Sequence, residues 1–98
     1  MSLCDLSNKR ILLTQASDFM GPALQRTLEN CGAEIIADTR DFLDPKAPQK
    51  LIAEAGEFDV LLLNLGVPAP STPADQVADE EWGLLFRHMV DPLPRFAR

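Results

Sequence analysis

Histidine and cysteine are scarce in this sequence, which has one histidine, His88, and two cysteines, Cys4 and Cys31. Zinc sites are built from clusters of these two residue types, so no metal is expected. Two cysteines fit a protein of the reducing cytoplasm, where free thiols are the expected state and a Cys4–Cys31 disulfide is the alternative. We therefore expect a cytoplasmic location.

Long hydrophobic runs and an excess of basic residues are also absent. No apolar stretch approaches the roughly 20 residues that a membrane-spanning helix needs, and the first residues lack the basic flank and apolar centre of a signal peptide. Nine basic residues face fifteen acidic ones, for a net charge of −6. Because such a chain repels phosphate backbones and anionic lipids, neither nucleic acid nor a membrane is expected as a partner.

Three short apolar runs predict buried strands, at 10–14, 33–37 and 58–63. The third run is apolar almost throughout, which is typical of a parallel sheet that is covered on both faces. Apolar residues make up 46% of the chain, enough for the core of one domain, so we treat 1–98 as part of a single domain.

Helical spacing of apolar residues follows each predicted strand. The first helix has Pro22 in its first turn and stops at Gly32. The second begins at Asp44-Pro45, a capping carboxylate before a proline, and closes at Gly56. The third begins near Asp79 and ends or kinks at two prolines; its apolar side is formed by Trp82, Leu85, Phe86 and Met89.

Alternating strands and helices predict an α/β fold with a doubly wound parallel sheet. Only the amino-terminal half of such a Rossmann-like fold is present. One helix–strand unit is missing, because about six residues separate Asp38 from Asp44 and a parallel crossover needs a dozen or more. Ligands bind such sheets at the carboxyl ends of the strands, so the loops after Thr14, Asp38 and Leu63 are the candidates for a site.

Three segments resemble motifs of the short-chain dehydrogenase/reductase superfamily, in the right order and spacing. Residues 12–21 (LLTQASDFMG) resemble its cofactor loop, a strand followed by T-G-x-x-x-G-x-G. Residues 59–66 (DVLLLNLG) resemble its D-V-L-V-N-N-A-G strand, and 81–90 resemble the helix that follows. The resemblance covers nearly the whole chain and implies that family's fold.

The cofactor loop departs from the family pattern at two glycines. Gln15 and Phe19 occupy the first two glycine positions, and Gly21 alone is retained. Glycine at these positions lets the backbone approach a pyrophosphate at the helix N-terminus. The ring of Phe19 would project into that space, so we expect no nicotinamide cofactor, with NAD or NADP as the alternative. Asp38 lies near the usual position of the ribose carboxylate; we expect it to cap or solvate the strand end, with a ribose contact as the alternative.

These losses together resemble halohydrin dehalogenases, which have the same fold without a nicotinamide. In that family an aromatic residue of the old cofactor loop helps to wall off a small halide pocket, and Phe19 matches it. Segments 9–14, 35–38 and 91–93 also resemble that family. The resemblance implies conversion of a vicinal haloalcohol to an epoxide and halide by a Ser-Tyr-Arg set. The chain has no tyrosine, so no catalytic residue is assigned and the chain alone should be inert.

The resemblance implies a ligand-pocket loop for a small-molecule substrate or halide. Its candidate residues are Gln15, Ser17, Asp18, Phe19, Gly21, Asn64, Gly66 and Pro70. Structural roles are the alternatives: turn formation and helix capping for the polar loop residues, packing under the sheet edge for the phenylalanine, and a rigid turn for the proline. Asn64 and Gly66 match the family's strand-end motif, in which the asparagine braces the central helix, and we favour this structural role over contact with substrate.

Three functions remain open at this point. The first is the amino-terminal segment of a halohydrin dehalogenase-like enzyme, the second a fragment of an NAD(P)-dependent oxidoreductase, and the third a non-catalytic half-domain. In the first two, the missing carboxyl-terminal half of the domain is a partner. The helix from Trp82 to Met89 is expected to lie in the core or to make a homo-oligomer. Met89 stands where ordinary dehydrogenases have an active-site asparagine, which argues against the second function.

Overall fold

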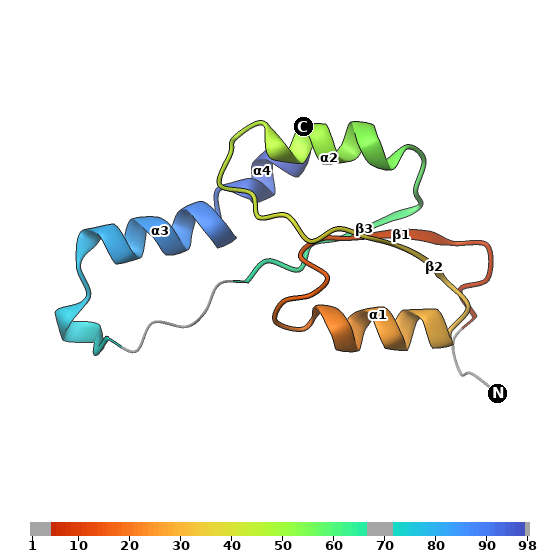
Figure 1. Cartoon of the computed structure of the whole chain (residues 1–98), viewed down its shortest axis with the longest axis horizontal. Coiled ribbons are helices and arrows are strands. Elements are labelled where there is room, and N and C mark those ends of the chain that lie inside the picture. Colours follow the sequence, from red (N-terminus) through yellow and green to blue (C-terminus); the bar gives the residue numbers. More distant parts are fainter. Residues whose placement is uncertain (1–4, 67–71, 98) are drawn as a thin grey trace.

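A computed structural model describes residues 5–66 and 72–97 of the chain. Its sheet has three parallel strands, β1 (Arg10–Leu13), β2 (Glu34–Ala37) and β3 (Val60–Leu62), in the order β2-β1-β3 (Figure 1). Ile11 lies opposite Ile35 on one side and Val60 on the other. The chain therefore adds a strand on one side of β1 and then crosses to the other side.

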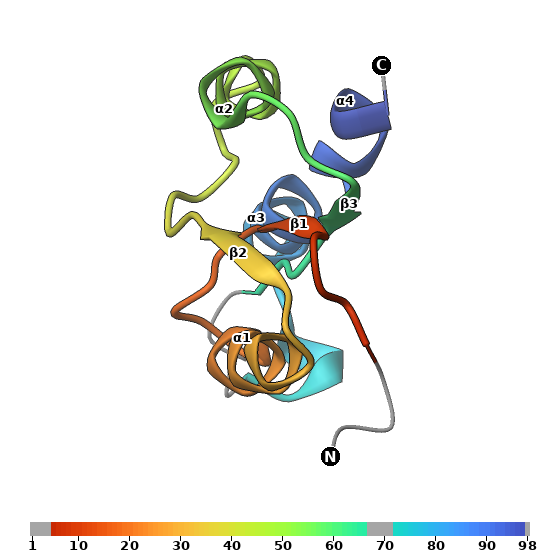
Figure 2. The ribbon, with the colours of Figure 1, turned by 90° about the vertical axis from the view of Figure 1, so that its right-hand side faces the viewer.

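The central strand is the most deeply buried element because helices cover both faces of the sheet. Helix α1 (Gly21–Asn30) lies on one face, and α2 (Ala47–Ala55) and α4 (Pro92–Ala97) lie on the other (Figure 2). All three apolar residues of β1 are at most 3% exposed. The α/β class with a parallel sheet is thus confirmed.

The edge strands are less well covered than the sequence suggested. We expected the third strand to be buried on both faces, but Val60 is 44% exposed and Leu61 and Leu62 are only half-buried. Among the described residues, β2 and β3 each pair only with β1. A uniformly apolar strand indicates that both faces can be covered, but it does not say that the covering elements are present.

No helix–strand unit intervenes between β2 and α2, as the short spacing predicted. The connection instead sends Phe42 into the core, where it is fully buried and meets Phe96 of α4 edge to face at a ring-centroid distance of 4.8 Å. This aromatic pair closes the apolar layer between the sheet and α2. The remaining buried residues of that layer are Leu12, Ala47, Leu51 and Leu65.

The start of the second helix differs from the prediction. Asp44 does not cap α2 directly; its carboxylate accepts a hydrogen bond from the Lys46 amide at 2.9 Å and its carbonyl accepts one from Ala47 at 3.0 Å. The aspartate therefore forms a turn that leads into the helix, and the proline in the first helical turn is Pro48, not Pro45. Both prolines are tolerated there because the first amides of a helix have no intrahelical partner.

The carboxyl-terminal region contains one more helix than expected. A short 3₁₀ turn, Ala74–Gln76, precedes α3 (Asp79–Met89), which matches the predicted third helix. Pro92 does end that helix, but it also opens α4, whose Pro92 and Phe96 are buried. None of the described helices has the length and apolar character needed to cross a membrane.

Candidate functional site

The loops that follow β1 and β3 lie together at the carboxyl end of the sheet, where parallel α/β sheets hold their ligands. The first loop runs over 14–20 and the second begins at Asn64. The structure brings most of the predicted pocket residues to this edge. Pro70 lies outside the described residues.

Thr14 and Asn64 extend the pairing of β1 with β3 through a side chain. The Thr14 hydroxyl donates to the Asn64 carbonyl at 2.8 Å and accepts from the Asn64 amide at 2.9 Å. Thr14 is fully buried, so both backbone groups of Asn64 depend on this hydroxyl. From the sequence, Thr14 was expected only to end a strand; a hydroxyl at the close of an apolar run was the available signal.

The side-chain amide of Gln15 fills the space between the two loops. Its Nε2 donates to the Gly66 carbonyl at 2.9 Å, and its Oε1 accepts from the Gly66 amide at 3.2 Å. Gln15 is 3% exposed and Gly66 is buried. The side chain of Gln15 thus pairs with the backbone of Gly66 as a residue of a neighbouring strand would. It fills the space between the two loops that follow β1 and β3.

Asn64 braces the β1–α1 loop. Its Nδ2 donates to the carbonyls of Gln15, at 3.0 Å, and Asp18, at 2.9 Å. The side chain is 5% exposed. A bracing role was the favoured interpretation of Asn64, and the partner of its side-chain amide is the β1–α1 loop and not a helix.

The backbone of the loop is left-handed at the two positions where the superfamily pattern has glycine. Gln15 has φ of 42° and Phe19 has φ of 51°. Side chains other than glycine pay roughly 1–2 kcal/mol for this conformation. Gly21 occupies the third glycine position, and glycine is required there for steric reasons. A Cβ on Gly21 would stand 2.3 Å from the Ala16 carbonyl oxygen.

Phe19 is 75% exposed, so its ring is not packed under the sheet edge. Its Cβ lies over the second loop, where a Cβ added to Gly66 would be only 3.0 Å away. Ser17 and Asp18 are also exposed, and the Asp18 carboxylate is 3.4 Å from Gln15 Nε2. The face of the loop that a ligand would meet therefore consists of a serine, an aspartate and a phenyl ring.

Asp38, at the carboxyl end of β2, is engaged by a residue that the sequence analysis did not single out. Its carboxylate accepts hydrogen bonds from the Arg40 side chain at 3.0 Å and the Arg40 amide at 3.2 Å. Arg40 also pairs with Glu54 of α2. The hydrogen bond that the guanidinium donates to the Glu54 carboxylate, followed by the contacts with Asp38, raises the pKa of Arg40. Asp38 thus fastens the β2–α2 connection, in line with a strand-end role.

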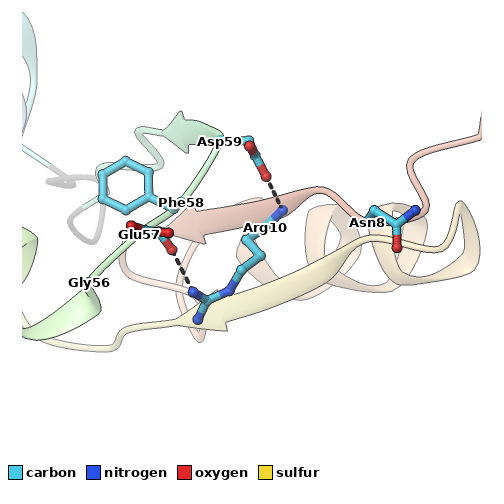
Figure 3. Close-up of a pocket in the computed structure, with 6 residues that line it drawn as sticks. All are labelled: Asn8, Arg10, Gly56, Glu57, Phe58 and Asp59. Atoms are coloured by element: carbon cyan, nitrogen blue, oxygen red, sulfur yellow. Dashed lines mark hydrogen bonds between the residues drawn. The ribbon is translucent and has the colours of Figure 1, made fainter.

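A hollow of about 480 Å³ lies at the opposite edge of the sheet and is lined by Asn8, Arg10 and residues 56–59 (Figure 3). Arg10 donates from Nη1 to the Glu57 carbonyl at 2.7 Å, and its amide donates to the Asp59 carboxylate at 2.8 Å. Arg10 also forms an ion pair with Glu34 at 3.4 Å. These contacts fasten the amino ends of the three strands, although the buried Nε of Arg10 has no hydrogen-bond partner among the described residues.

The exposed groups of the β1–α1 loop at the carboxyl edge include a hydroxyl, a carboxylate and a phenyl ring. In residues 5–66 and 72–97, no group of three or more histidine, cysteine or acidic residues is arranged to hold a metal ion. The sequence has no tyrosine to serve as a phenolic base. No protein-family model matches the chain, and the comparison with curated proteins also gave no match.

Proposed function

We propose that this chain is the amino-terminal part of an enzyme with the short-chain dehydrogenase/reductase fold, closest in kind to the halohydrin dehalogenases. It would form half of a doubly wound sheet and would bind no nicotinamide. The observation that carries the proposal is the closed gap at the ends of β1 and β3, where Gln15 is hydrogen-bonded to both backbone groups of Gly66.

The backbone of the β1–α1 loop supports an origin in a cofactor loop. Two positive φ angles fall on Gln15 and Phe19, and the close approach of Gly21 to Ala16 falls on the third position of the glycine pattern. A dinucleotide loop uses its glycines for a tight turn, for approach to the pyrophosphate, and for helix–strand contact. The β1–α1 loop keeps the tight turn and the close helix–strand contact. Side chains fill the space through which the backbone would otherwise approach the pyrophosphate.

The connection from β2 to α2 supports the same conclusion from the adenine side. A complete nucleotide-binding half has a further helix–strand unit beyond β2, and here the chain passes directly to α2. Both oxygens of the Asp38 carboxylate accept hydrogen bonds from Arg40, which leaves that group committed within the chain. The ribose of a dinucleotide would therefore find no uncommitted carboxylate to bind its hydroxyls. The adenine would lack the side of its pocket that the missing helix–strand unit supplies.

The reaction implied is an internal displacement in a vicinal haloalcohol. A tyrosine outside this chain removes the alcohol proton, the oxygen forms a bond to the neighbouring carbon, and the carbon–halogen bond breaks with both electrons leaving on the halide. The contribution of this chain is to line the pocket: Phe19 presents its ring beside the loop, and Asn64 and Gln15 hold the loop in place.

The test is the gene product read through to its stop codon. We expect codons beyond Arg98 to supply a serine and, about a dozen residues later, Tyr-x-x-x-Arg. The protein so completed should release bromide from a vicinal bromo-alcohol without added nicotinamide, as followed by halide release and by epoxide formation. A tyrosine-to-phenylalanine variant of the same protein is the matched control and should be inactive.

Two results would overturn the proposal. A frame with Tyr-x-x-x-Lys and NAD(P)-dependent oxidation of an alcohol would assign the chain to an oxidoreductase. A frame that stops after Arg98, giving a soluble protein that turns over neither substrate, would make the chain a non-catalytic half-domain.

A further inference from the structure

Phe19 has a position in the β1–α1 loop that the stability of the fold does not explain. Its backbone is left-handed, with φ of 51°, and this conformation costs free energy for any residue with a side chain. Its ring is 75% exposed, so little of that cost is recovered by burial. Gln15, which is also left-handed, differs because its buried amide binds both backbone groups of Gly66. A strained residue without such compensation points to a role in binding.

The carboxylate of Asp18 has no cationic partner in residues 5–66 and 72–97. This side chain is exposed and accepts one long hydrogen bond there, from Gln15 Nε2 at 3.4 Å. The other carboxylate that we have described at this edge of the sheet, that of Asp38, is paired with Arg40 at 3.0 Å. The β1–α1 loop therefore presents an unpaired negative charge beside an exposed phenyl ring.

Helix α1 begins at Gly21, and its amino end offsets this charge only in part. The amino end of a helix carries about half an elementary positive charge, whereas a carboxylate carries a full negative one. The net charge of the chain, −6, adds to the negative potential. A cation is therefore attracted to the exposed face of the loop, and an anion is repelled.

The backbone of Asp18 is fixed before a ligand arrives. Its amide donates to the Gln15 carbonyl at 2.9 Å, and its carbonyl accepts from the Gly21 amide at 2.8 Å and from Asn64 Nδ2 at 2.9 Å. Because the loop is already hydrogen-bonded, binding costs little backbone conformational entropy. The carboxylate and the neighbouring ring of Phe19 are thus presented together from an ordered segment.

We propose that the exposed face of the β1–α1 loop recognises an ammonium group, which the Asp18 carboxylate attracts and the Phe19 ring contacts. A carboxylate binds such a cation through its charge, and an aromatic ring binds it through the negative face of its π system. The recognition of ammonium depends on the loop alone. The substrate class that follows, a vicinal haloalcohol with an ammonium substituent, rests on the proposed function.

Other ligands are less consistent with this face of the loop. A phosphate or a carboxylate would be repelled by Asp18, and a neutral apolar group would contact the ring but leave the carboxylate without a partner. A metal ion would need further ligands, and the described residues contain no group of three or more histidine, cysteine or acidic residues that could supply them. An ammonium group with apolar substituents uses both the carboxylate and the ring.

Binding is tested by adding tetramethylammonium chloride to the ¹⁵N-labelled whole chain, with sodium chloride at equal ionic strength as the reference. We expect saturable shifts of the Asp18 and Phe19 amide resonances, and a dissociation constant at least about fivefold lower than that for tert-butanol, a neutral molecule of similar shape. Asp18→Asn and Phe19→Leu should each weaken binding about three- to tenfold.

Glu29→Gln is the matched control, because it removes the same charge from an exposed residue at the far end of α1. It should leave the dissociation constant unchanged. Equal binding of tert-butanol, shifts that sodium chloride reproduces, or equal effects of Glu29→Gln and Asp18→Asn would overturn the proposal.

Turnover by the completed gene product tests the substrate class. A vicinal bromo-alcohol with a trimethylammonium group is compared with the analogue that carries a tert-butyl group instead. We expect kcat/KM to favour the cation about tenfold, chiefly through KM, and Asp18→Asn to reduce this ratio to about one. Bromide release without the preference would overturn the substrate class and leave the dehalogenase proposal intact. Binding of tetramethylammonium that depends on Asp18, with no bromide released from either substrate, would overturn the dehalogenase proposal and leave the ammonium site intact.

Discussion

Gln15 and Phe19 offer a paired experiment, because both have left-handed backbone and only one has side-chain hydrogen bonds. Replacing either by glycine removes strain of roughly 1–2 kcal/mol. Glycine also gains freedom in the unfolded chain, which costs about 0.5–1 kcal/mol. On the backbone alone, each substitution should therefore stabilise the fold by roughly 0.5–1 kcal/mol.

The side chains give the two variants opposite signs. Phe19 is 75% exposed and loses little burial, so Phe19→Gly should keep the net gain. Gln15→Gly leaves the buried amide and carbonyl of Gly66 without partners, at about 1–3 kcal/mol each. After subtraction of the backbone gain, the free energy of unfolding should fall by about 1–5 kcal/mol.

Urea unfolding followed by far-UV circular dichroism measures both changes. With a slope of about 1–1.5 kcal/mol/M for a chain of this size, Phe19→Gly should raise the midpoint by about 0.5 M. Gln15→Gly should lower it by about 2 M or abolish the cooperative transition. All samples are compared at one protein concentration, so that self-association contributes equally. The reasoning is refuted if Phe19→Gly destabilises as strongly as Gln15→Gly, or if both variants are stabilised.

Three further predictions use the same unfolding assay. Gly21→Ala should destabilise the fold by about 2–4 kcal/mol, because its Cβ would stand 2.3 Å from the Ala16 carbonyl oxygen; Gly83→Ala, which meets only the tip of a flexible arginine at 3.4 Å, is the control and should stabilise by up to about 1 kcal/mol. A Gly21→Ala variant as stable as Gly83→Ala would contradict the tight helix–loop contact. Thr14→Val should cost about 1–3 kcal/mol, because the buried hydroxyl serves both backbone groups of Asn64; no loss would mean that those hydrogen bonds do not form. Phe42→Ala should cost about 3–5 kcal/mol, since the ring is fully buried against α4, and a change under 1 kcal/mol would remove the aromatic pair from the core.

The sequence predicted the order of strands and helices because each has a local signal. Short apolar runs gave the strands, and helical spacing gave α1, α2 and α3. The prediction failed at Pro92, because a proline can either end one helix or begin the next. Pro92 was expected to end or kink a helix; it ends α3 and also begins α4, and only the burial of Pro92 and Phe96 in three dimensions distinguishes these roles.

At the candidate site, the sequence located the loops but not their hydrogen bonds. Gln15 stood out as a missing glycine, yet nothing local indicated that its amide would bind both backbone groups of Gly66, 51 residues away. Thr14 and Arg40 were missed for the same reason, because their partners lie on other elements. Long-range polar contacts of this kind depend on the arrangement of the elements, which spacing along the chain does not record.

We propose that side chains close the dinucleotide space at the ends of β1 and β3. Titration of ¹⁵N-labelled protein with NADH and NADPH up to millimolar concentration, followed by two-dimensional amide spectra, is the decisive experiment. We expect the amide resonances of Gln15, Phe19, Gly21 and Gly66 to keep their chemical shifts throughout the titration. Saturable shifts concentrated on those four amides would contradict it.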